Sequence, residues 1–330
     1  MSGSLKNLIE NNIEFKNLKK FSLIIGNSPS KGARSPILWN KIYKRLKLKH
    51  LMLPADVLSE NFDKFIKSIK KEKKFLGGAV TVPFKEKIIG YLDYIDPVAK
   101  KIGAVNIVVN SKGRLKGYNT DYDGCVYTLK NSQIKRKKLE ILVLGLGGAA
   151  KSVLFSVNSF FNNSHIYIYN RSKKNFFLEK KNKNSIKILH NLHSFKKKVF
   201  HIIINATSVG FDSWLKIGDK FINYKYFTPF SNLEKIKPIS KNNLNDFFDL
   251  NKKLIVKNVD ETIKFIKKNS KAFIFDIIYS PNKTNLLKLS ELFNIKSTNG
   301  LDMNLYQACK GFALVNKFFN KDKIFHIMKN

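Results

Sequence analysis

The chain has 330 residues, 43% of them hydrophobic, and its 61 lysines and arginines outnumber its 24 acidic residues to give a formal net charge of +37. The length suffices for two domains, and no apolar run is as long as a membrane-spanning helix, which argues against an integral membrane protein. Residues 1–20 mix glutamates with lysines and lack the apolar stretch of a secretory signal, so we expect a cytoplasmic protein.

The basic charge admits two explanations. Nucleic-acid binding usually shows as a basic patch with interleaved aromatic residues, whereas these lysines are spread along most of the chain beside abundant Asn, Ile and Phe. A bias toward AT-rich codons accounts for the same composition, so we expect no specific nucleic-acid partner. Cys125 and Cys309 are far apart, and the six histidines have no ligand spacing, so we expect neither a disulfide nor a metal site.

The N-terminal part alternates strand and helix patterns, with polar or small residues where the strands end. Lys85 follows a short apolar strand that Pro83 stops, and the carboxyl edge of a sheet is where α/β proteins collect ligands. Asp121 begins a helix-like segment, and for this residue helix capping is the simplest role. The predicted elements are strands at 21–25, 51–54, within 77–82 and at 103–109 and helices beginning near Pro36, Leu58, Lys85 and Pro97.

The middle of the chain contains an apolar run, Leu139 to Leu144, that ends in the glycine-rich turn Gly145-Leu-Gly-Gly-Ala149. A buried strand followed by such a turn and a helix is typical of a dinucleotide site, although similar turns also occur without a ligand. The next strand, 165–169, runs into Asn170 and Arg171 where an NAD site would have a carboxylate, so the pattern favours NADP. The alternative is that Arg171 belongs to a solvated strand end.

The remaining chain reads as a strand at 199–204, a strand at 272–276, a helix at 285–293 and a helix after Gly300. The segment 211–271 shows one credible helix, near 260–268, and we interpret it as an irregular insertion. The alternation of strands and helices predicts an α/β fold.

Several motifs occur together in one order, and their combination resembles the shikimate dehydrogenase family over most of the chain. They are Ser35-Pro36 with Asn40, Thr81-Val-Pro-Phe-Lys85, Gly103-Ala-Val-Asn106, Asn119-Thr-Asp121, the glycine turn, Asn170-Arg171-Ser172, Asn205-Ala-Thr-Ser208 and the segment from Gly300 to Gln307. The resemblance implies a substrate-binding α/β domain, 1–122 with 300–330, and an NADP-binding Rossmann-type domain, 123–299. It also implies that the C-terminal helices return to the first domain. It also implies NADPH-dependent reduction of 3-dehydroshikimate to shikimate in chorismate and aromatic amino-acid biosynthesis.

The resemblance assigns roles to particular residues. Lys85 and Asp121 are expected to be the catalytic pair; for Lys85 the alternative is a solvated residue at a helix start. The expected substrate contacts are Ser35, Thr81, Asn106, Tyr279 and Gln307, and the expected cofactor contacts are Gly145, Gly147, Gly148, Ala149, Asn170, Arg171, Ser172, Lys174, Thr207 and Gly300. Burial would lower the pKa of a catalytic lysine and a neighbouring carboxylate would oppose that shift.

The chain departs from the family pattern in the substrate loop, where Ala33 replaces the first serine and Gly32 a histidine in a loop that is one residue longer. Ser28 or Ser30 is a candidate to replace the lost hydroxyl. The basic residue expected after Ser172 is Asn175, which leaves Lys173 or Lys174 for the phosphate contact. Altered preference, for example for quinate, and a degenerate non-catalytic nucleotide-binding protein are therefore alternatives. We expect a monomer or a homodimer.

Overall fold

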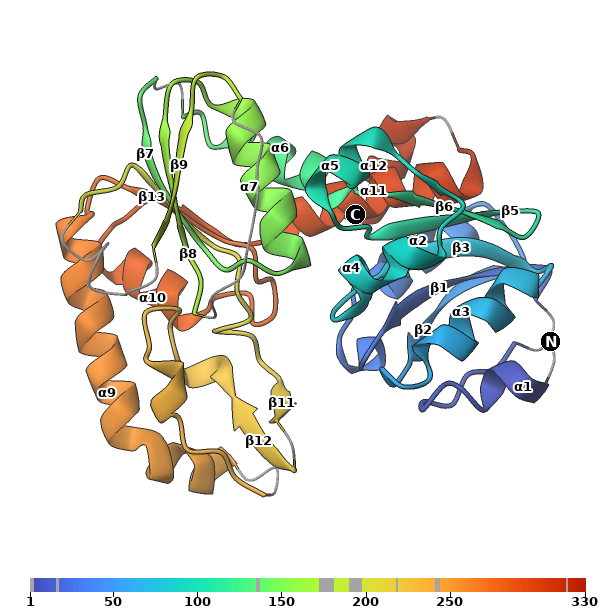
Figure 1. The fold of residues 1–330 in the computed structure, drawn as a ribbon, viewed down its shortest axis with the longest axis horizontal. Helices are drawn as coiled ribbons and strands as arrows, with labels where there is room; N and C mark the ends of the chain where they lie inside the picture. Colours follow the sequence, from blue (N-terminus) through green and yellow to red (C-terminus); the bar gives the residue numbers. More distant parts are fainter. Residues whose placement is uncertain are drawn as a thin grey trace. The chain divides into compact units, whose positions relative to one another are not determined.

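The computed structural model describes residues 3–15, 18–134, 137–171, 181–189, 198–217, 219–240, 244–318 and 320–330. It divides into two compact units, Met1–Ser132 with Asp302–Asn330, and Gln133–Leu301 (Figure 1). The domain boundary expected after residue 122 lies near the start of α6 (Asp121–Asn131), and the first unit contains all of this helix. The chain was expected to return to the first domain at Gly300, slightly before Asp302, where the first unit resumes.

The first unit is built on one six-stranded sheet with the order β2-β1-β3-β5-β6-β4. Strands β2, β1 and β3 are parallel, whereas β5 is antiparallel to both β3 and β6. Its elements are α1 (Gly3–Lys6), β1 (Lys20–Gly26), η1 (Pro29–Lys31), α2 (Ser35–Arg45), β2 (His50–Asp56), α3 (Phe62–Lys71), β3 (Phe75–Val80), α4 (Phe84–Lys87), η2 (Ile88–Tyr91), β4 (Tyr94–Ile95), α5 (Pro97–Ile102), β5 (Ile107–Ser111), β6 (Arg114–Tyr118), α6 (Asp121–Asn131), α11 (Leu301–Asn316) and α12 (Lys321–Lys329).

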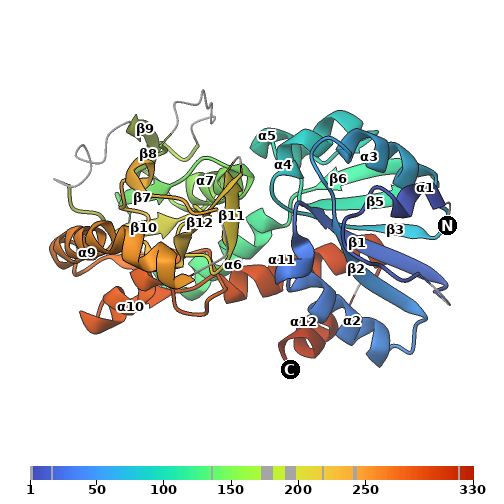
Figure 2. The same ribbon diagram turned by 90° about the horizontal axis from the view of Figure 1, so that it is seen from below.

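Helices cover both faces of this sheet. Side chains alternate along a strand, so Leu23 of β1 packs with α3 on one face and Ile24 packs with α2 and α11 on the other. The C-terminal helices thus belong to the core of the N-terminal sheet, and α12 lies beside α2 (Figure 2). The C-terminal helix α11 thus packs on the N-terminal sheet and lies next to the strand ends that carry the predicted catalytic residues.

The second unit has a six-stranded parallel sheet with the order β14-β13-β10-β7-β8-β9. When only the strands of this sheet are numbered along the chain, the order is 3-2-1-4-5-6 read from β9. This is the arrangement of a Rossmann fold, which confirms the predicted α/β class. The elements are β7 (Glu140–Leu144), α7 (Gly148–Phe160), β8 (His165–Tyr169), β9 (Ser185–Leu189), β10 (Ile202–Asn205), β11 (Trp214–Ile217), β12 (Lys220–Asn223), η3 (Tyr224–Tyr226), η4 (Leu233–Lys235), α9 (Leu244–Lys268), β13 (Phe273–Asp276), α10 (Asn285–Leu292) and β14 (Ser297–Thr298).

The expectation that residues 211–271 are irregular is wrong. This segment contains an antiparallel hairpin, β11 with β12, and the 25-residue helix α9, which Figure 1 shows along the second unit. The helical period was hidden because the buried side of α9 is partly polar. Asn251, Asn258 and Thr262 are buried there at helical spacing between Phe247 and Phe265.

Those buried polar groups are satisfied by the preceding loop. Asn251 accepts from the backbone N–H of Lys237 at 2.8 Å and donates to its carbonyl at 2.9 Å, while Asn258 accepts from the Thr228 backbone at 2.8 Å. The hydrogen bonds make these asparagines compatible with a buried helix face.

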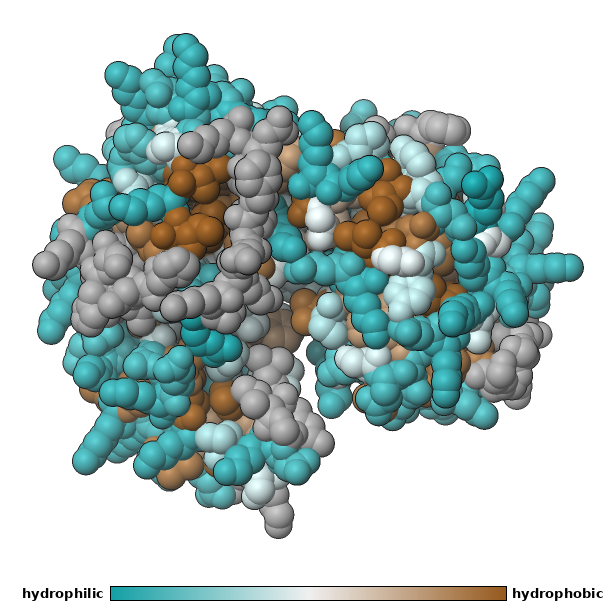
Figure 3. Space-filling model, viewed as in Figure 1, coloured by the Kyte–Doolittle hydropathy of each residue, from teal (hydrophilic) through white to brown (hydrophobic). Residues whose placement is uncertain are grey.

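The surface seen in Figure 3 is largely hydrophilic, with smaller apolar areas, as the high content of lysine leads one to expect. Among the described residues, none of the helices is long and apolar enough to cross a membrane.

Candidate active site

Strand pairing in the first unit brings three separate chain segments together. Ile107 of β5 lies opposite Tyr118 of β6, so the residues just before β5 and just after β6 are neighbours. Asn106, before β5, donates its backbone N–H to the Tyr118 carbonyl at 3.0 Å and accepts from Val80 of β3 at 2.8 Å. The ends of β3, β5 and β6 therefore form one polar edge of the sheet.

Lys85 and Asp121 form an ion pair at this edge. Lys85 Nζ lies 2.6 Å from Asp121 Oδ2, and the two side chains are only 14% and 9% exposed. Lys85 belongs to the short helix α4, and its carbonyl accepts the backbone N–H of Val105 at 2.8 Å. Lys85 is thus not a solvated helix-start residue. Asp121 is the first residue of α6, after the N-cap residue Thr120, and its carboxylate faces Lys85 rather than capping the helix.

Asn106 holds the other oxygen of Asp121. Its Nδ2 donates to Asp121 Oδ1 at 2.9 Å and also lies 3.1 Å from Thr120 Oγ1 and 3.3 Å from Gln307 Oε1. Its Oδ1 accepts the backbone N–H of Thr120 at 2.7 Å. An amide has only two N–H donors for these three acceptors. Asn106 therefore fixes the orientation of Asp121, and Gln307 of α11 reaches the same cluster.

Thr120 was not predicted as a site residue, although it lies inside the Asn119-Thr-Asp121 motif. Its hydroxyl donates to the Gln307 carbonyl at 3.0 Å and is buried. Thr120 therefore connects α11 to the start of α6. Only the return of the C-terminal helices to the first unit gives it this partner, so local sequence carried no signal for the contact.

The substrate loop lies between β1 and α2. Ser35 is the first residue of α2 and is 5% exposed, and its hydroxyl has no hydrogen-bond partner among the described residues. Thr81 packs its methyl group where a Cβ on Gly26 would lie, at 2.3 Å, so Gly26 must be glycine. Thr81 directly follows β3, which is parallel to β1, and Ser35 begins the helix that follows β1.

Ser30 is not available to replace the hydroxyl that Ala33 lacks. Its side chain donates a short hydrogen bond to Asp56 Oδ2, and its backbone N–H donates to Asp56 Oδ1 at 2.9 Å. Asp56 was missed from the sequence; its signal is the position at the end of β2, where the residue is 7% exposed. The pair fixes the longer loop to the sheet.

In the second unit, the glycine turn joins β7 to α7. Gly145 has φ of +106°, and a Cβ there would lie 2.8 Å from the Ala206 carbonyl, so only glycine fits. Gly147 is the N-cap of α7, which has no side-chain cap, and a Cβ there would meet nothing within 4 Å. Open space thus lies over the N-terminus of α7, which begins with Gly148 and Ala149 and has no side-chain cap.

The end of β8 lies beside this turn. Leu144 and Tyr169 are paired, and Gly145 donates its backbone N–H to the Tyr169 carbonyl at 2.8 Å. Asn170 and Arg171 follow at once, and Arg171 is exposed. Ser172 and Lys174, which were also predicted to contact the cofactor, lie outside the described residues, as does the alternative Lys173.

On the other side of the turn, Thr207 follows β10. Its hydroxyl donates to Asn205 Oδ1 at 2.7 Å and accepts the Val209 backbone N–H at 3.1 Å. The topological switch point of the sheet lies between β7 and β10, which is where Rossmann folds bind dinucleotides. Gly145, Thr207 and Arg171 are all placed at this edge.

Asp276 is a buried residue that sequence analysis missed. It accepts hydrogen bonds from Thr284 at 2.7 Å, the Ile278 backbone at 3.1 Å and Asn205 at 3.0 Å. Burial raises its pKa to about 7, although these hydrogen bonds oppose the shift. Its position as the last residue of an apolar strand was the available signal.

Tyr279 and Gly300 lie on the chain that follows β13. A Cβ on Gly300 would be 1.9 Å from the Ile277 carbonyl, so close backbone packing already requires a glycine there. Tyr279 is partly buried in the second unit. The predicted contacts of Tyr279 with substrate and of Gly300 with cofactor remain predictions.

The residues of the switch point fit a dinucleotide with an additional phosphate. An uncapped helix N-terminus offers backbone N–H donors to a pyrophosphate, and the open space over Gly147 allows close approach. Arg171 can bind a phosphate through two donors, whereas a carboxylate for a ribose 2′-hydroxyl is absent from residues 169–171. The donor set favours NADP over NAD.

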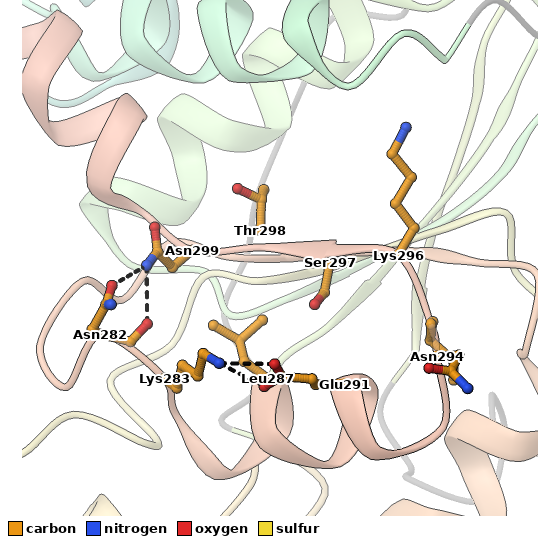
Figure 4. A pocket seen from close by; sticks show the side chains of 10 residues that line it. Asn282, Lys283, Leu287, Glu291, Asn294, Lys296, Ser297, Thr298 and Asn299 are labelled. Atoms are coloured by element: carbon orange, nitrogen blue, oxygen red, sulfur yellow. Dashed lines mark hydrogen bonds and ion pairs between the residues drawn. The ribbon is translucent and has the colours of Figure 1, made fainter.

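A separate cavity of about 640 Å³ lies in the second unit between α10 and the edge strand β14 (Figure 4). Lys283 forms an ion pair with Glu291 at 2.8 Å, and Asn299 donates to the Asn282 carbonyl at 2.9 Å. The cavity contains none of the predicted site residues, and these polar groups pair with one another.

Comparison with known proteins agrees with this arrangement. Residues 24–108 match the family model described as the shikimate dehydrogenase substrate binding domain. The chain is 34% identical over 297 residues to a shikimate dehydrogenase (NADP(+)) of Dictyoglomus thermophilum, which covers 88% of each chain. Over 313 residues it is 31% identical to the enzyme of that name from Caldanaerobacter subterraneus, with 93% of this chain and 95% of that protein covered.

Solved structures show the same similarity. Shikimate dehydrogenase 1 from Peptoclostridium difficile has a TM-score of 0.69 and 26% identity, with 94% of this chain and 98% of that chain covered. A shikimate dehydrogenase in complex with NADP+ has a TM-score of 0.67 and 27% identity, with 94% and 95% covered.

Proposed function

We propose, from the premise that this chain belongs to the shikimate dehydrogenase family, that Lys85 and Asp121 are its catalytic pair. The protein is an NADP-dependent oxidoreductase that interconverts 3-dehydroshikimate and shikimate. The observation that carries the residue assignment is the sequestered ion pair at the polar edge of the first sheet, inside a network that also contains Asn106 and Gln307.

The reaction sets a defined requirement at this edge. NADPH supplies the hydride when bound. As the carbonyl carbon of the substrate gains that hydride, negative charge develops on its oxygen and must be stabilised or protonated. The ammonium of Lys85 can donate to that oxygen because it is held at the edge of the sheet and largely protected from water.

Asp121 balances the charge of Lys85 in the resting site. Its second oxygen is held by Asn106, so the carboxylate cannot turn away when a substrate hydroxyl approaches. After Lys85 gives up a proton, the remaining carboxylate favours rapid return of a proton to the amine. The pair thus combines a donor for the reacting oxygen with an acceptor for a neighbouring hydroxyl.

The other predicted contacts are assigned to substrate recognition. Ser35 and Thr81 have hydroxyls without a partner among the described residues; Ser35 begins α2 and Thr81 directly follows β3. Gln307 joins the same network through its amide. Tyr279 is assigned a substrate contact, and Asn106 acts mainly through Asp121.

The cofactor is held by the second unit. Gly145, Gly147, Gly148 and Ala149 are assigned to the pyrophosphate, and Arg171 with Asn170 to the 2′-phosphate. Thr207 is also assigned to the cofactor, and Ser172, Lys174 and Gly300 complete the assignment.

The test is to follow NADPH oxidation with purified protein and 3-dehydroshikimate, with 3-dehydroquinate as the competing substrate. We expect turnover with 3-dehydroshikimate and a preference for NADPH over NADH. Faster turnover of 3-dehydroquinate indicates the altered preference that Ala33 raises, and absence of turnover with either substrate contradicts the proposed function.

We also propose a cellular location and an assembly state for the protein. We assign the protein to the cytoplasm, as a monomer or a homodimer with a small-molecule substrate. Sedimentation velocity distinguishes the two assemblies, and a larger particle contradicts both.

A further inference from the structure

Asn205 and Asp276 end two neighbouring strands of the second unit and lie side by side in its interior. Strands β10 and β13 are parallel, and their register pairs Asn205 with Asp276. Both residues are 0% exposed, and Asn205 Nδ2 donates to Asp276 Oδ1 at 3.0 Å. Neither residue has a role in the proposed function, although Thr207, two residues after Asn205, is assigned to the cofactor there. The following inference rests on that assignment.

The side chain of Asn205 organises the turn that follows β10. Its Oδ1 accepts the Thr207 hydroxyl at 2.7 Å and the Thr207 backbone N–H at 3.1 Å. Its Nδ2 donates to the Val209 carbonyl at 3.2 Å as well as to Asp276. An amide has two donor hydrogens and two acceptor lone pairs, so these four hydrogen bonds use its full capacity. One side chain therefore holds the turn, and it does so in one orientation.

Asp276 is the contact outside the turn that selects this orientation. With the amide turned over, its oxygen would face the Asp276 carboxyl and its NH2 group would face the Thr207 N–H, so both hydrogen bonds would be lost. The carboxyl of Asp276 is fixed on both sides. Its Oδ1 also accepts the Ile278 backbone N–H at 3.1 Å, and its Oδ2 accepts the Thr284 hydroxyl at 2.7 Å. Asp276 is therefore a fixed acceptor against which the Asn205 amide is oriented.

This chain of hydrogen bonds ends at the glycine turn. Thr207 gives its hydroxyl proton to Asn205, and its hydroxyl oxygen accepts the Val209 backbone N–H at 3.1 Å. The methyl group of Thr207 lies 3.1 Å from the position that a Cβ on Gly145 would take. Asn205 thus fixes the rotamer in which Thr207 turns its hydroxyl toward Asn205 and its methyl group toward Gly145.

We propose that Asp276 is a positioning residue for cofactor binding, because it orients the Asn205 amide and, through it, the side of Thr207 that meets NADPH. Thr207 is partly buried whereas Asp276 is fully buried, so Asp276 acts through the turn and not by contact with the cofactor. Residues that act through such a chain of contacts change ligand affinity by about 3- to 30-fold. Loss of the Asp276 acceptor should therefore weaken NADPH binding by such a factor and leave the chemical step unchanged.

The experiment measures the dissociation constant of NADPH by fluorescence titration, and kcat at saturating NADPH and 3-dehydroshikimate, in wild type, Asp276→Ala, Asp276→Asn and Thr284→Val. Asp276→Ala removes the acceptor for Asn205, so the dissociation constant should rise by about 3- to 30-fold while kcat stays within about twofold. Asp276→Asn keeps a carbonyl oxygen for Asn205 and Ile278, so its NADPH affinity should stay within about twofold of wild type.

Thr284→Val is the matched control for damage to the fold. It removes the hydrogen bond at the other oxygen of the same carboxyl, and Thr284 is also the N-cap residue of α10. The variant should therefore lower the midpoint of urea unfolding, as Asp276→Ala does. It leaves the contact between Asp276 and Asn205 in place, so NADPH affinity should stay within about twofold of wild type.

A double variant tests the path through Asn205. If Asp276 acts through Asn205, Asp276→Ala combined with Asn205→Ala should weaken NADPH binding no more than the stronger single variant does, whereas independent effects multiply. If these variants do not fold, Thr207→Val tests the partly buried end of the path, because valine keeps the shape and lacks the hydroxyl. It should raise the dissociation constant by about threefold or more.

Four results overturn the proposal. They are wild-type NADPH affinity in Asp276→Ala or, where that variant does not fold, in Thr207→Val; equal losses of affinity in Asp276→Ala and Thr284→Val; a loss in Asp276→Asn as large as in Asp276→Ala; and multiplied losses in the double variant. Failure of wild type to bind NADPH counts instead against the proposed function, so the two failures are distinguishable.

Discussion

Replacement of Asp276 by asparagine tests whether a buried carboxyl makes the stability of the second unit depend on pH. The pKa of Asp276 is raised from 3.8 to about 7, because burial outweighs the hydrogen bonds from Thr284, Ile278 and Asn205. Between pH 4 and pH 7 the folded protein therefore keeps a proton that the unfolded chain has lost. The free energy of unfolding falls as pH rises through this window and becomes independent of this group above it.

The size of the effect follows from the same values. Each unit of pKa difference is worth about 1.4 kcal/mol, so the window from 3.8 to about 7 corresponds to at most about 4 kcal/mol. The amide side chain introduced by Asp276→Asn cannot ionise, and its carbonyl oxygen can still accept from Asn205 and Ile278. Relative to wild type, Asp276→Asn should gain stability as pH rises from 5 to 7.5, with a slope of up to about 1.4 kcal/mol per pH unit.

The assay is urea unfolding at several pH values, followed by the fluorescence of Trp214 in a Trp39→Phe background so that the second unit is observed. Asp212→Asn is the control, because Asp212 is an exposed residue of the same unit, 3.4 Å from Lys225. Its curve should run parallel to that of wild type. Parallel curves for Asp276→Asn and wild type would refute the assigned pKa.

Three further changes test the two sites. Asn106→Ala removes the amide that holds Asp121 and leaves the buried Thr120 N–H unsatisfied. The free energy of unfolding should therefore fall by about 3–5 kcal/mol, and kcat should fall by at least about tenfold. The control Asn110→Ala loses two hydrogen bonds to backbone groups, and it should lower the free energy of unfolding by about 1–2 kcal/mol and leave kcat unchanged. A wild-type kcat in Asn106→Ala contradicts the positioning role. Gly145→Ala puts a Cβ 2.8 Å from a carbonyl at positive φ, so NADPH affinity measured by fluorescence titration should fall by about tenfold or more, and unaltered affinity argues against the tight turn. Arg171→Gln should raise KM for NADPH by about tenfold and leave that for NADH within about twofold; equal effects on both cofactors rule out a 2′-phosphate contact.

Residues at strand ends could be placed from the sequence because both sheets put their functional groups at one edge. Lys85 and Gly145 each come after an apolar run, so the local pattern located them along the chain. The parallel pairing of the strands then brings such strand ends to one edge of each sheet. The Rossmann order of the second sheet follows from the same alternation of strands and helices. For these residues, the end of an apolar run in the sequence coincides with the end of a strand at the functional edge of the sheet.

Other features depend on contacts that no local pattern contains. The buried face of α9 is half polar, and its asparagines look like surface residues until the loop that satisfies them is known. Thr120 acquires the Gln307 carbonyl as a hydrogen-bond partner only when α11 returns from the far end of the chain. Asp276 likewise differs from an ordinary strand-end carboxylate because the fold buries it completely, and the local sequence does not show that burial.

The most direct test of the central claim is the single-turnover rate of NADPH oxidation with saturating 3-dehydroshikimate in wild type, Lys85→Ala and Asp121→Asn. General acid–base catalysis contributes about 10²- to 10⁴-fold, so both variants should be slower by factors in this range while their NADPH affinity stays within about twofold of wild type. Wild-type rates in Lys85→Ala would contradict the account, because the ion pair at the edge of the first sheet would then have no part in the reaction.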